Sequence, residues 1–252
     1  GNDAGLAVAG LNFPAYAEYA DDPVDGKTNI AAYEFPLWVA ATFSTVDEGE
    51  AALRDTVIVA KSAGEGLGVS LLHWIIGDSQ RSIVVEMMAD GLNVYDDPVD
   101  TLANQPTFPW HMENLRTYIT ATSDFPQTAT WRGAELKPYG AGAGMRGIPG
   151  DCYSPSRFVK AAYLNANYPQ KESETENVVR MFRSLEGEEM LEVASRRGDG
   201  KFEKTIYTGC FSARTGNYYY AMYGDPSIRY VSLMDAEGAS PDRLVVPEPR
   251  RS

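Results

Sequence analysis

The sequence has little cysteine and little histidine, and both shortages exclude classes of chemistry. Its two cysteines, Cys152 and Cys210, are too few for a disulfide framework and too far apart for a CxxC redox or zinc pair. Its two histidines, His73 and His111, show no paired spacing that would indicate a metal site. We therefore expect reduced cysteines, no metal and no other cofactor.

Basic residues and long apolar runs are also scarce. The chain has 22 Lys and Arg against 35 Asp and Glu, and its formal charge of −13 opposes binding to nucleic acid or to an anionic membrane. No apolar run reaches the roughly 18 residues of a membrane span, and the first ten residues lack the charged and apolar regions of a signal peptide. We expect a soluble intracellular protein, unless a leader has been removed.

The 252 residues, 44% of them apolar, are enough for a globular protein with a substantial core. We find no internal repeat, low-complexity segment or long linker, so we predict a single domain over residues 1–252. The chain begins at Gly1 and soon enters LAVAGLNF, which is typical of a buried strand with neighbours on both sides. We therefore expect that material is missing upstream.

Hydrophobic periodicity predicts a layered α+β domain. Helices are expected over 33–43 and from near Val46, where Thr45 and Glu48 fit a capping box. TVIVA, LLHWIIGD, SIVVEMMAD and GLNVYDD then resemble an antiparallel meander. Helical spacing over 157–168 and 172–196 separates this meander from a second antiparallel set, TIYTGCFS and NYYYAMY. Helices between two antiparallel strand sets argue against a parallel βαβ sheet.

The stretch from Gly142 to Gly147, GAGMRG, matches the GxGxxG pattern of a dinucleotide-binding loop. Its context does not fit, because proline lies on both sides and no helix opens on the last glycine. Cys152 with nearby Arg157 suggests a thiolate, but a nucleophilic cysteine also needs a base. Both histidines are explained better by packing or capping.

Five ordered segments carry a resemblance to a known family: GLAVAGLNFP, LLHWIIGD, SIVVE, LANQPTFPWHMENL and GAGAGMRGIPGDCYSPSRFVKAAY. Together they resemble the choloylglycine hydrolase family. The resemblance implies an αββα sandwich of the N-terminal nucleophile hydrolase type, incomplete at its N-terminus. It also implies cleavage of the amide that joins a bile acid to glycine or taurine, by a homotetramer in the cytoplasm of gut bacteria.

The same resemblance implies roles for three residues. Asn104 matches the asparagine whose side-chain amide stabilises the oxyanion, and Asn12 matches the residue whose backbone N–H is the second donor. Arg157 matches the arginine that favours the nucleophilic thiolate. Without the resemblance, Asn104 would be a turn residue, Asn12 a polar residue at a strand end, and Arg157 a surface residue at a helix start.

The sequence also departs from the family. The family nucleophile is an N-terminal cysteine whose own α-amino group serves as the base. Gly1 cannot replace it and Cys152 has no such base, so we expect these residues alone to be inactive. Ala15 stands where the family commonly has glycine, and the loop over 61–68 falls in a region that varies near the active-site mouth.

Two alternatives remain open. One is a penicillin V acylase of the same family, which Asn12 disfavours because that branch tends to have tyrosine there. The other is a non-catalytic steroid-binding homologue.

Overall fold

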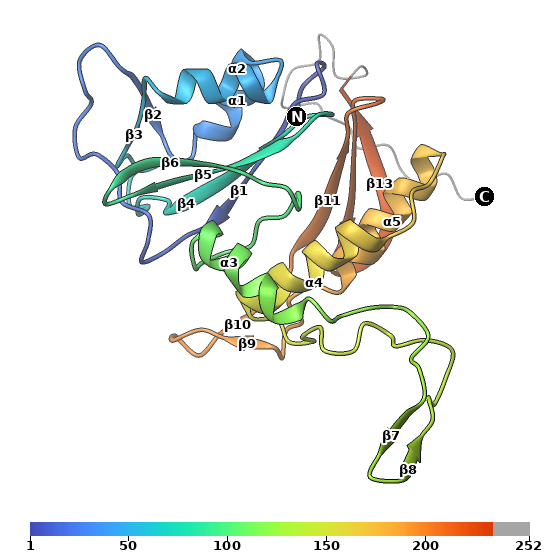
Figure 1. Cartoon of the computed structure of the whole chain (residues 1–252). Coiled ribbons are helices and arrows are strands. Elements are labelled where there is room, and N and C mark those ends of the chain that lie inside the picture. The colour runs from blue at the N-terminus through green and yellow to red at the C-terminus, as the bar shows by residue number, and fades with distance from the viewer. Residues whose placement is uncertain (234–252) are drawn as a thin grey trace.

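The computed structural model describes residues 1–233, which form two main antiparallel sheets with helices packed against them (Figure 1). The first sheet has the strand order β1-β4-β5-β6. Its strands are β1 (Ala7–Asn12), β4 (Leu72–Gly77), β5 (Ser82–Met88) and β6 (Gly91–Asp96). β1 pairs with β4 and forms one edge of the sheet, so only one of its two expected neighbours is found among the described residues.

The predicted meander is confirmed for β4, β5 and β6 but is wrong for TVIVA. This segment is β3 (Thr56–Val59), and it pairs in parallel with β2 (Thr28–Ala31) in a separate two-stranded sheet. The helices α1 (Phe35–Thr42) and α2 (Val46–Leu53) form the crossover between the two strands. A parallel pair needs a crossover of this kind, and the strand composition of TVIVA does not reveal its partner.

Helices α1 and α2 cover one face of the four-stranded sheet. Their apolar residues Phe35, Val39 and Val46 pack with Trp74 and Ile76 of β4 in the larger buried cluster. The predicted cap of α2 is confirmed, since the Thr45 side chain accepts a hydrogen bond from the backbone N–H of Glu48. The Glu48 carboxylate accepts from the backbone N–H of Ser44, one residue earlier than a standard capping box.

The opposite face of β5 packs against a second cluster, which positions the residues of interest. Val84 of β5 meets Phe108 of α3 (Phe108–Leu115) and Phe158 of α4 (Ser154–Asn167). Ala103, in the loop before α3, and Ala162 of α4 also belong to this cluster. The loop, α3 and the beginning of α4 are therefore held together against one sheet.

The second main sheet has the order β11-β12-β13, with β11 (Tyr207–Ser212), β12 (Asn217–Met222) and β13 (Asp225–Ser232). Helix α5 (Glu174–Glu186) packs against β11. The helix expected over 172–196 is therefore too long. It ends before Gly187, and the backbone N–H of Met190 donates instead to Thr205 Oγ1 at 2.9 Å.

Two short hairpins complete the described structure. The pair β9 (Ser195–Arg196) and β10 (Phe202–Glu203) follows α5. The pair β7 (Ala129–Trp131) and β8 (Ala134–Leu136) extends away from both sheets (Figure 1). The α+β class is confirmed. Within residues 1–233, no helix combines the length and apolar character that a membrane crossing requires.

Candidate active site

The structure brings Asn12, Asn104 and Arg157 together in one hydrogen-bonded chain. The Asn104 side-chain Nδ2 donates to the Asn12 carbonyl oxygen at 2.8 Å. Arg157 Nη2 donates to Asn104 Oδ1 at 2.6 Å. Asn104 is 92 residues from Asn12 and 53 residues from Arg157 in the sequence, so only the fold creates this arrangement.

The two partners determine which way the Asn104 amide faces. A guanidinium group can only donate hydrogen bonds, and a backbone carbonyl can only accept them. The amide oxygen must therefore face Arg157, and the amide nitrogen must face Asn12. One of the two Nδ2 hydrogens is used by Asn12, which leaves the other available for a further acceptor.

Asn12 presents its backbone at the open edge of β1. The backbone N–H of Phe13 donates to Leu71, and β1 and β4 are antiparallel with Asn12 opposite Leu72. Because hydrogen-bonded and non-bonded positions alternate along such a pair, the N–H and carbonyl of Asn12 both face away from β4. The carbonyl accepts from Asn104, and the N–H lies at the same edge.

Arg157 is fixed by the first turn of α4. Its Nε donates to the Cys152 carbonyl oxygen at 3.1 Å, so two donors of one guanidinium bind two different segments. The side chain is half-buried and forms no ion pair with any acidic side chain in residues 1–233. Its positive charge acts on the buried Glu188 carboxyl without forming an ion pair with it, and it can also stabilise a second anion nearby.

The glycine-rich stretch before α4 is a loop, as its context predicted. Gly144 and Gly147 have φ angles of +60° and +101°, which favour glycine, and α4 begins only at Ser154. No helix N-terminus therefore opens on the last glycine as in a dinucleotide site. Cys152 is partly buried with its Sγ 3.6 Å from the Glu189 carbonyl oxygen. Its contact with Arg157 is made by the backbone carbonyl and not by the thiol.

His111 of α3 holds the backbone of Asn104 by a hydrogen bond. Its ring is fully buried, is stacked on Phe158 with centroids 4.4 Å apart, and places Nε2 2.9 Å from the Asn104 carbonyl oxygen. Burial lowers the pKa of His111, which favours the neutral ring. Because a carbonyl only accepts, the ring hydrogen is on Nε2. The expected packing role is confirmed.

Glu86 and His73 form a buried pair that the sequence pattern alone does not reveal. Both side chains are fully buried, and His73 Nδ1 lies 3.1 Å from Glu86 Oε1. The same oxygen accepts the backbone N–H of Phe108 at 2.9 Å. The available signal was a glutamate inside the apolar strand SIVVEMM, where an unpaired charge would be costly.

A family model for linear amide C–N hydrolases of the choloylglycine hydrolase family matches residues 1–245. The chain belongs to the choloylglycine hydrolase family. It is 49% identical over 245 residues to a bile salt hydrolase/transferase of Bifidobacterium longum subsp. longum, which covers 97% of this chain and 77% of the relative. It is 40% identical over 235 residues to a conjugated bile acid hydrolase of Lactobacillus acidophilus, at 93% and 74% coverage.

Solved structures show the same fold. A mutant of the conjugated bile acid hydrolase from Clostridium perfringens matches with a TM-score of 0.85 and 35% identity, over 92% of this chain and 71% of that one. Penicillin V acylase from Agrobacterium tumefaciens matches with a TM-score of 0.69 at 18% identity, over 92% and 64%, and shows the fold alone. The expected N-terminal nucleophile hydrolase fold is confirmed, and the protein is a linear amide hydrolase.

Proposed function

We propose that the protein hydrolyses the amide bond of bile acids conjugated to glycine or taurine. The observation that carries this proposal is the chain of hydrogen bonds from Arg157 through Asn104 to Asn12. Two N–H donors and a cation that forms no ion pair with an acidic side chain in the described residues meet at one edge of the sheet. The choice of substrate is supported by the relatives named for bile salts and conjugated bile acids.

The geometry suits attack by a thiolate on an amide carbonyl. As the sulfur–carbon bond forms, negative charge develops on the carbonyl oxygen. That oxygen would accept from the free Nδ2 hydrogen of Asn104 and from the Asn12 N–H, and each such donor is worth about 3 kcal/mol. Collapse of the intermediate breaks the carbon–nitrogen bond, and the leaving amine of glycine or taurine takes the proton that the α-amino base removed from the thiol. Water then hydrolyses the thioester and frees the bile acid.

We place the nucleophile outside these 252 residues. Gly1 has no side chain, Cys210 is partly buried in β11, and the Cys152 thiol faces the Glu189 carbonyl and not the Asn104 amide. We therefore expect a preparation of residues 1–252 alone to release no glycine or taurine. A preparation in which these residues follow a segment that begins with the family's cysteine should hydrolyse; we call it the cysteine-bearing enzyme.

The test compares three substrates with the cysteine-bearing enzyme: glycocholate, taurocholate and penicillin V. Release of glycine or taurine, lost after alkylation of the thiol, would support the proposal. Preferential cleavage of penicillin V would instead support the acylase alternative. Binding of bile acid without hydrolysis by any cysteine-bearing form would favour the steroid-binding homologue. Thiol-dependent amine release by residues 1–252 alone would contradict the assignment of the nucleophile.

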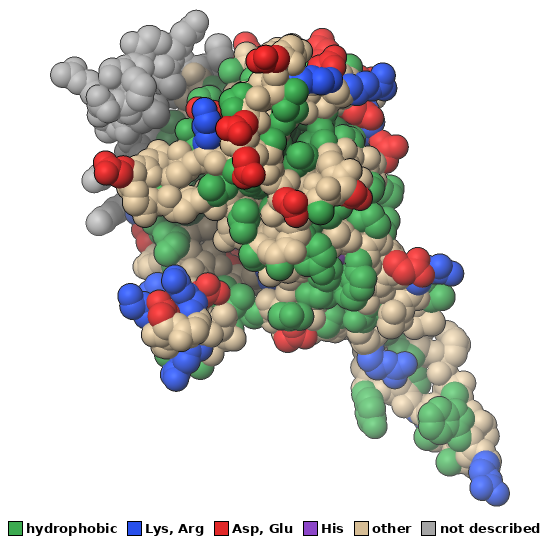
Figure 2. Space-filling model, turned by 90° about the vertical axis from the view of Figure 1, so that its left-hand side faces the viewer, with side chains coloured by type: hydrophobic (Ala, Val, Ile, Leu, Met, Phe, Trp, Pro, Cys, Tyr) green, Lys and Arg blue, Asp and Glu red, His purple; other side chains and the backbone are tan. Residues whose placement is uncertain are grey.

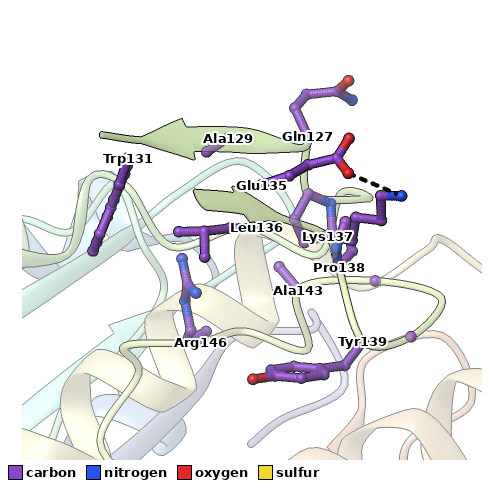
Figure 3. Close-up of a pocket in the computed structure, with 13 residues that line it drawn as sticks. Gln127, Ala129, Trp131, Glu135, Leu136, Lys137, Pro138, Tyr139, Ala143 and Arg146 are labelled. Carbon is purple, nitrogen blue, oxygen red and sulfur yellow. Dashed lines mark ion pairs between the residues drawn. The ribbon is translucent and has the colours of Figure 1, made fainter. Parts of the chain in front are cut away.

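We also propose that the protein is a homotetramer, with the β7–β8 hairpin in its subunit interface. The hairpin projects from the body of the molecule and carries exposed apolar side chains (Figure 2). The exposed fractions are 74% for Trp131 and 41% for Leu136. A cavity of about 660 Å³ lies between the hairpin and the glycine-rich loop, and Figure 3 shows Trp131, Leu136 and Arg146 along one side of it. Exposed apolar groups on a projecting arm are typical of contact sites.

The remaining expectations stay proposals. We propose a single domain over residues 1–252 and a cytoplasmic location in a gut bacterium. Free thiols at Cys152 and Cys210 fit a reducing compartment, and the relatives named above are bacterial. Cell fractionation with an antibody to the protein would test the location, and a single cooperative unfolding transition would support one domain.

A further inference from the structure

The buried pair of Glu86 and His73 lies behind the candidate active site and touches neither substrate-facing group directly. Glu86 is on β5 and His73 is on β4, and both side chains are fully buried, out of contact with bulk solvent. Burying a carboxylate is costly unless it is hydrogen-bonded, so the position of Glu86 calls for an explanation in the contacts it makes.

One contact leads toward Asn104. Helix α3 has Thr107 at its N-cap, but Thr107 makes no side-chain capping bond. Glu86 supplies the acceptor instead, from a neighbouring strand, by binding the N–H of Phe108 at 2.9 Å. A carboxylate at a helix N-terminus is stabilising, and here it fixes where α3 begins. His111, on the same short helix, then holds the Asn104 carbonyl.

The other contact leads toward Asn12. The His73 ring is stacked on Phe13, with centroids 4.1 Å apart and an interplanar angle of 8°. Phe13 is fully buried and follows Asn12 in the chain. As a carboxylate, Glu86 accepts from His73 Nδ1 and from the Phe108 N–H on one oxygen. One buried group therefore connects the supports of both oxyanion donors.

We propose that Glu86 is a positioning residue for the hydrolysis, which sets the Asn104 amide relative to the Asn12 backbone through α3 and through His73. The inference rests on the proposed function. Glu86 aligns two donors that act in the transition state. Its loss should therefore lower kcat more than it changes KM.

The test is a double-mutant cycle in the cysteine-bearing enzyme with glycocholate as substrate. Glu86→Gln keeps the shape and an amide oxygen but removes the charge, and we expect kcat to fall about tenfold with KM within about twofold. In an Asn104→Ala background the same change should cost about threefold or less, because the Asn104 donor is already gone and only the route through His73 to Asn12 remains. A purely structural role would give equal costs in both backgrounds.

Asp97→Asn is the matched control. Asp97 is also a buried carboxyl that accepts two backbone N–H groups, from Val99 and Thr101, but it makes no hydrogen bond to Asn104, His111 or α3. We expect it to lower stability and leave kcat within about twofold. If Glu86→Gln does not fold by circular dichroism, His73→Asn takes its place, since it keeps a donor near Glu86 and removes only the ring stacked on Phe13.

The outcomes separate the two proposals. If the unsubstituted cysteine-bearing enzyme shows no hydrolysis, the proposed function fails. If it hydrolyses glycocholate while Glu86→Gln lowers kcat no more than Asp97→Asn, or equally in both backgrounds, the positioning role is overturned. A loss in kcat that is clearly larger in the background that contains Asn104 supports it.

Discussion

The candidate active site and the β7–β8 hairpin are built in opposite ways. The site joins β1, the loop before α3 and the start of α4 through hydrogen bonds that cross 92 and 53 residues of sequence. The hairpin has two three-residue strands, all exposed, that pair only with each other. Groups that must hold a reacting atom need support from several directions, whereas a contact arm needs only to present its side chains. Substitutions in the candidate site should therefore change activity, whereas substitutions in the hairpin should change the association of subunits.

The largest effect is expected at Asn104. Asn104→Ala removes one of the two proposed oxyanion donors, and kcat of the cysteine-bearing enzyme should fall about 10²- to 10³-fold with a small change in KM. Steady-state kinetics with glycocholate would measure this. Asn167→Ala, at the exposed end of α4, is the control and should leave kcat unchanged. If Asn104→Ala lowers kcat less than about fivefold, the Asn104 amide is not an oxyanion donor.

A smaller effect is expected at Arg157. Lysine keeps the charge but cannot bind Asn104 Oδ1 and the Cys152 carbonyl together, as the guanidinium does. Arg157→Lys should lower kcat/KM about tenfold while the melting temperature changes little. The matched change Arg183→Lys, in an exposed pair with Glu186, should have no effect. Equal activity for Arg157→Lys would mean that charge alone is sufficient.

Glu188 should make stability depend on pH. Burial raises the pKa of its carboxyl to about 7, although Lys160 Nζ at 3.8 Å acts in the other direction. The folded state then binds the proton more tightly than the unfolded state, so this contribution is present below about pH 4.5 and is lost as the pH rises through 7. Glu188→Gln should raise the free energy of unfolding at pH 8 by on the order of 1 kcal/mol.

Urea unfolding at pH 4, 6 and 8 would measure how the effect of Glu188→Gln on the free energy of unfolding depends on pH. The gain should be largest at pH 8 and absent at pH 4. Glu186→Gln, at the exposed end of α5, provides the comparison and should show no such trend. A gain that is the same at every pH would indicate a packing effect instead of a titration.

Ala15 carries local strain in the turn after β1. Its φ is 68°, and it follows Pro14 in a turn closed by the Tyr16 N–H and the Phe13 carbonyl. Proline followed by a residue with positive φ is the pattern of a type II turn. Such a turn favours glycine at its third residue, which is Ala15 here. Ala15→Gly should raise the free energy of unfolding by about 0.5–1 kcal/mol, measured by urea titration. Ala17→Gly, where φ is not positive, should lower it.

The smallest effect on stability is expected in the hairpin. Trp131→Ser should change the free energy of unfolding by less than about 0.5 kcal/mol, because the side chain is 74% exposed. If the proposed tetramer forms through the hairpin, the same variant should shift it toward monomer in analytical ultracentrifugation. Persistence of the tetramer in Trp131→Ser and Leu136→Ser together would show that the arm is not the interface.

The sequence was sufficient for the local features. Periodicity located α1, α2, α4 and the strands from β4 to β6, and Thr45 marked a helix start that the structure shows. Prediction from local periodicity failed where an element's structure depends on a segment that is distant in the sequence. The parallel pairing of β3 with β2, and the end of α5 before Gly187, depend on contacts that no local pattern contains.

The candidate site shows the same division. The family resemblance identified Asn12, Asn104 and Arg157 singly, and their roles stay predictions. That they bind one another was visible only in the fold. Glu86 was missed because a glutamate in a strand is ordinarily assigned to the solvent-facing side, and its burial on β5 became evident only with α3 packed over it.

The orientation of the Asn104 amide has a chemical consequence for the durability of the protein. Replacing its nitrogen by oxygen would keep the shape and the attraction to Arg157, but the new oxygen would face the lone pairs of the Asn12 carbonyl. The surroundings thus discriminate between asparagine and aspartate, two groups of nearly equal size, by polarity alone. Slow deamidation at this one side chain would convert the proposed oxyanion donor into an acceptor, and ageing samples should lose activity in step with it.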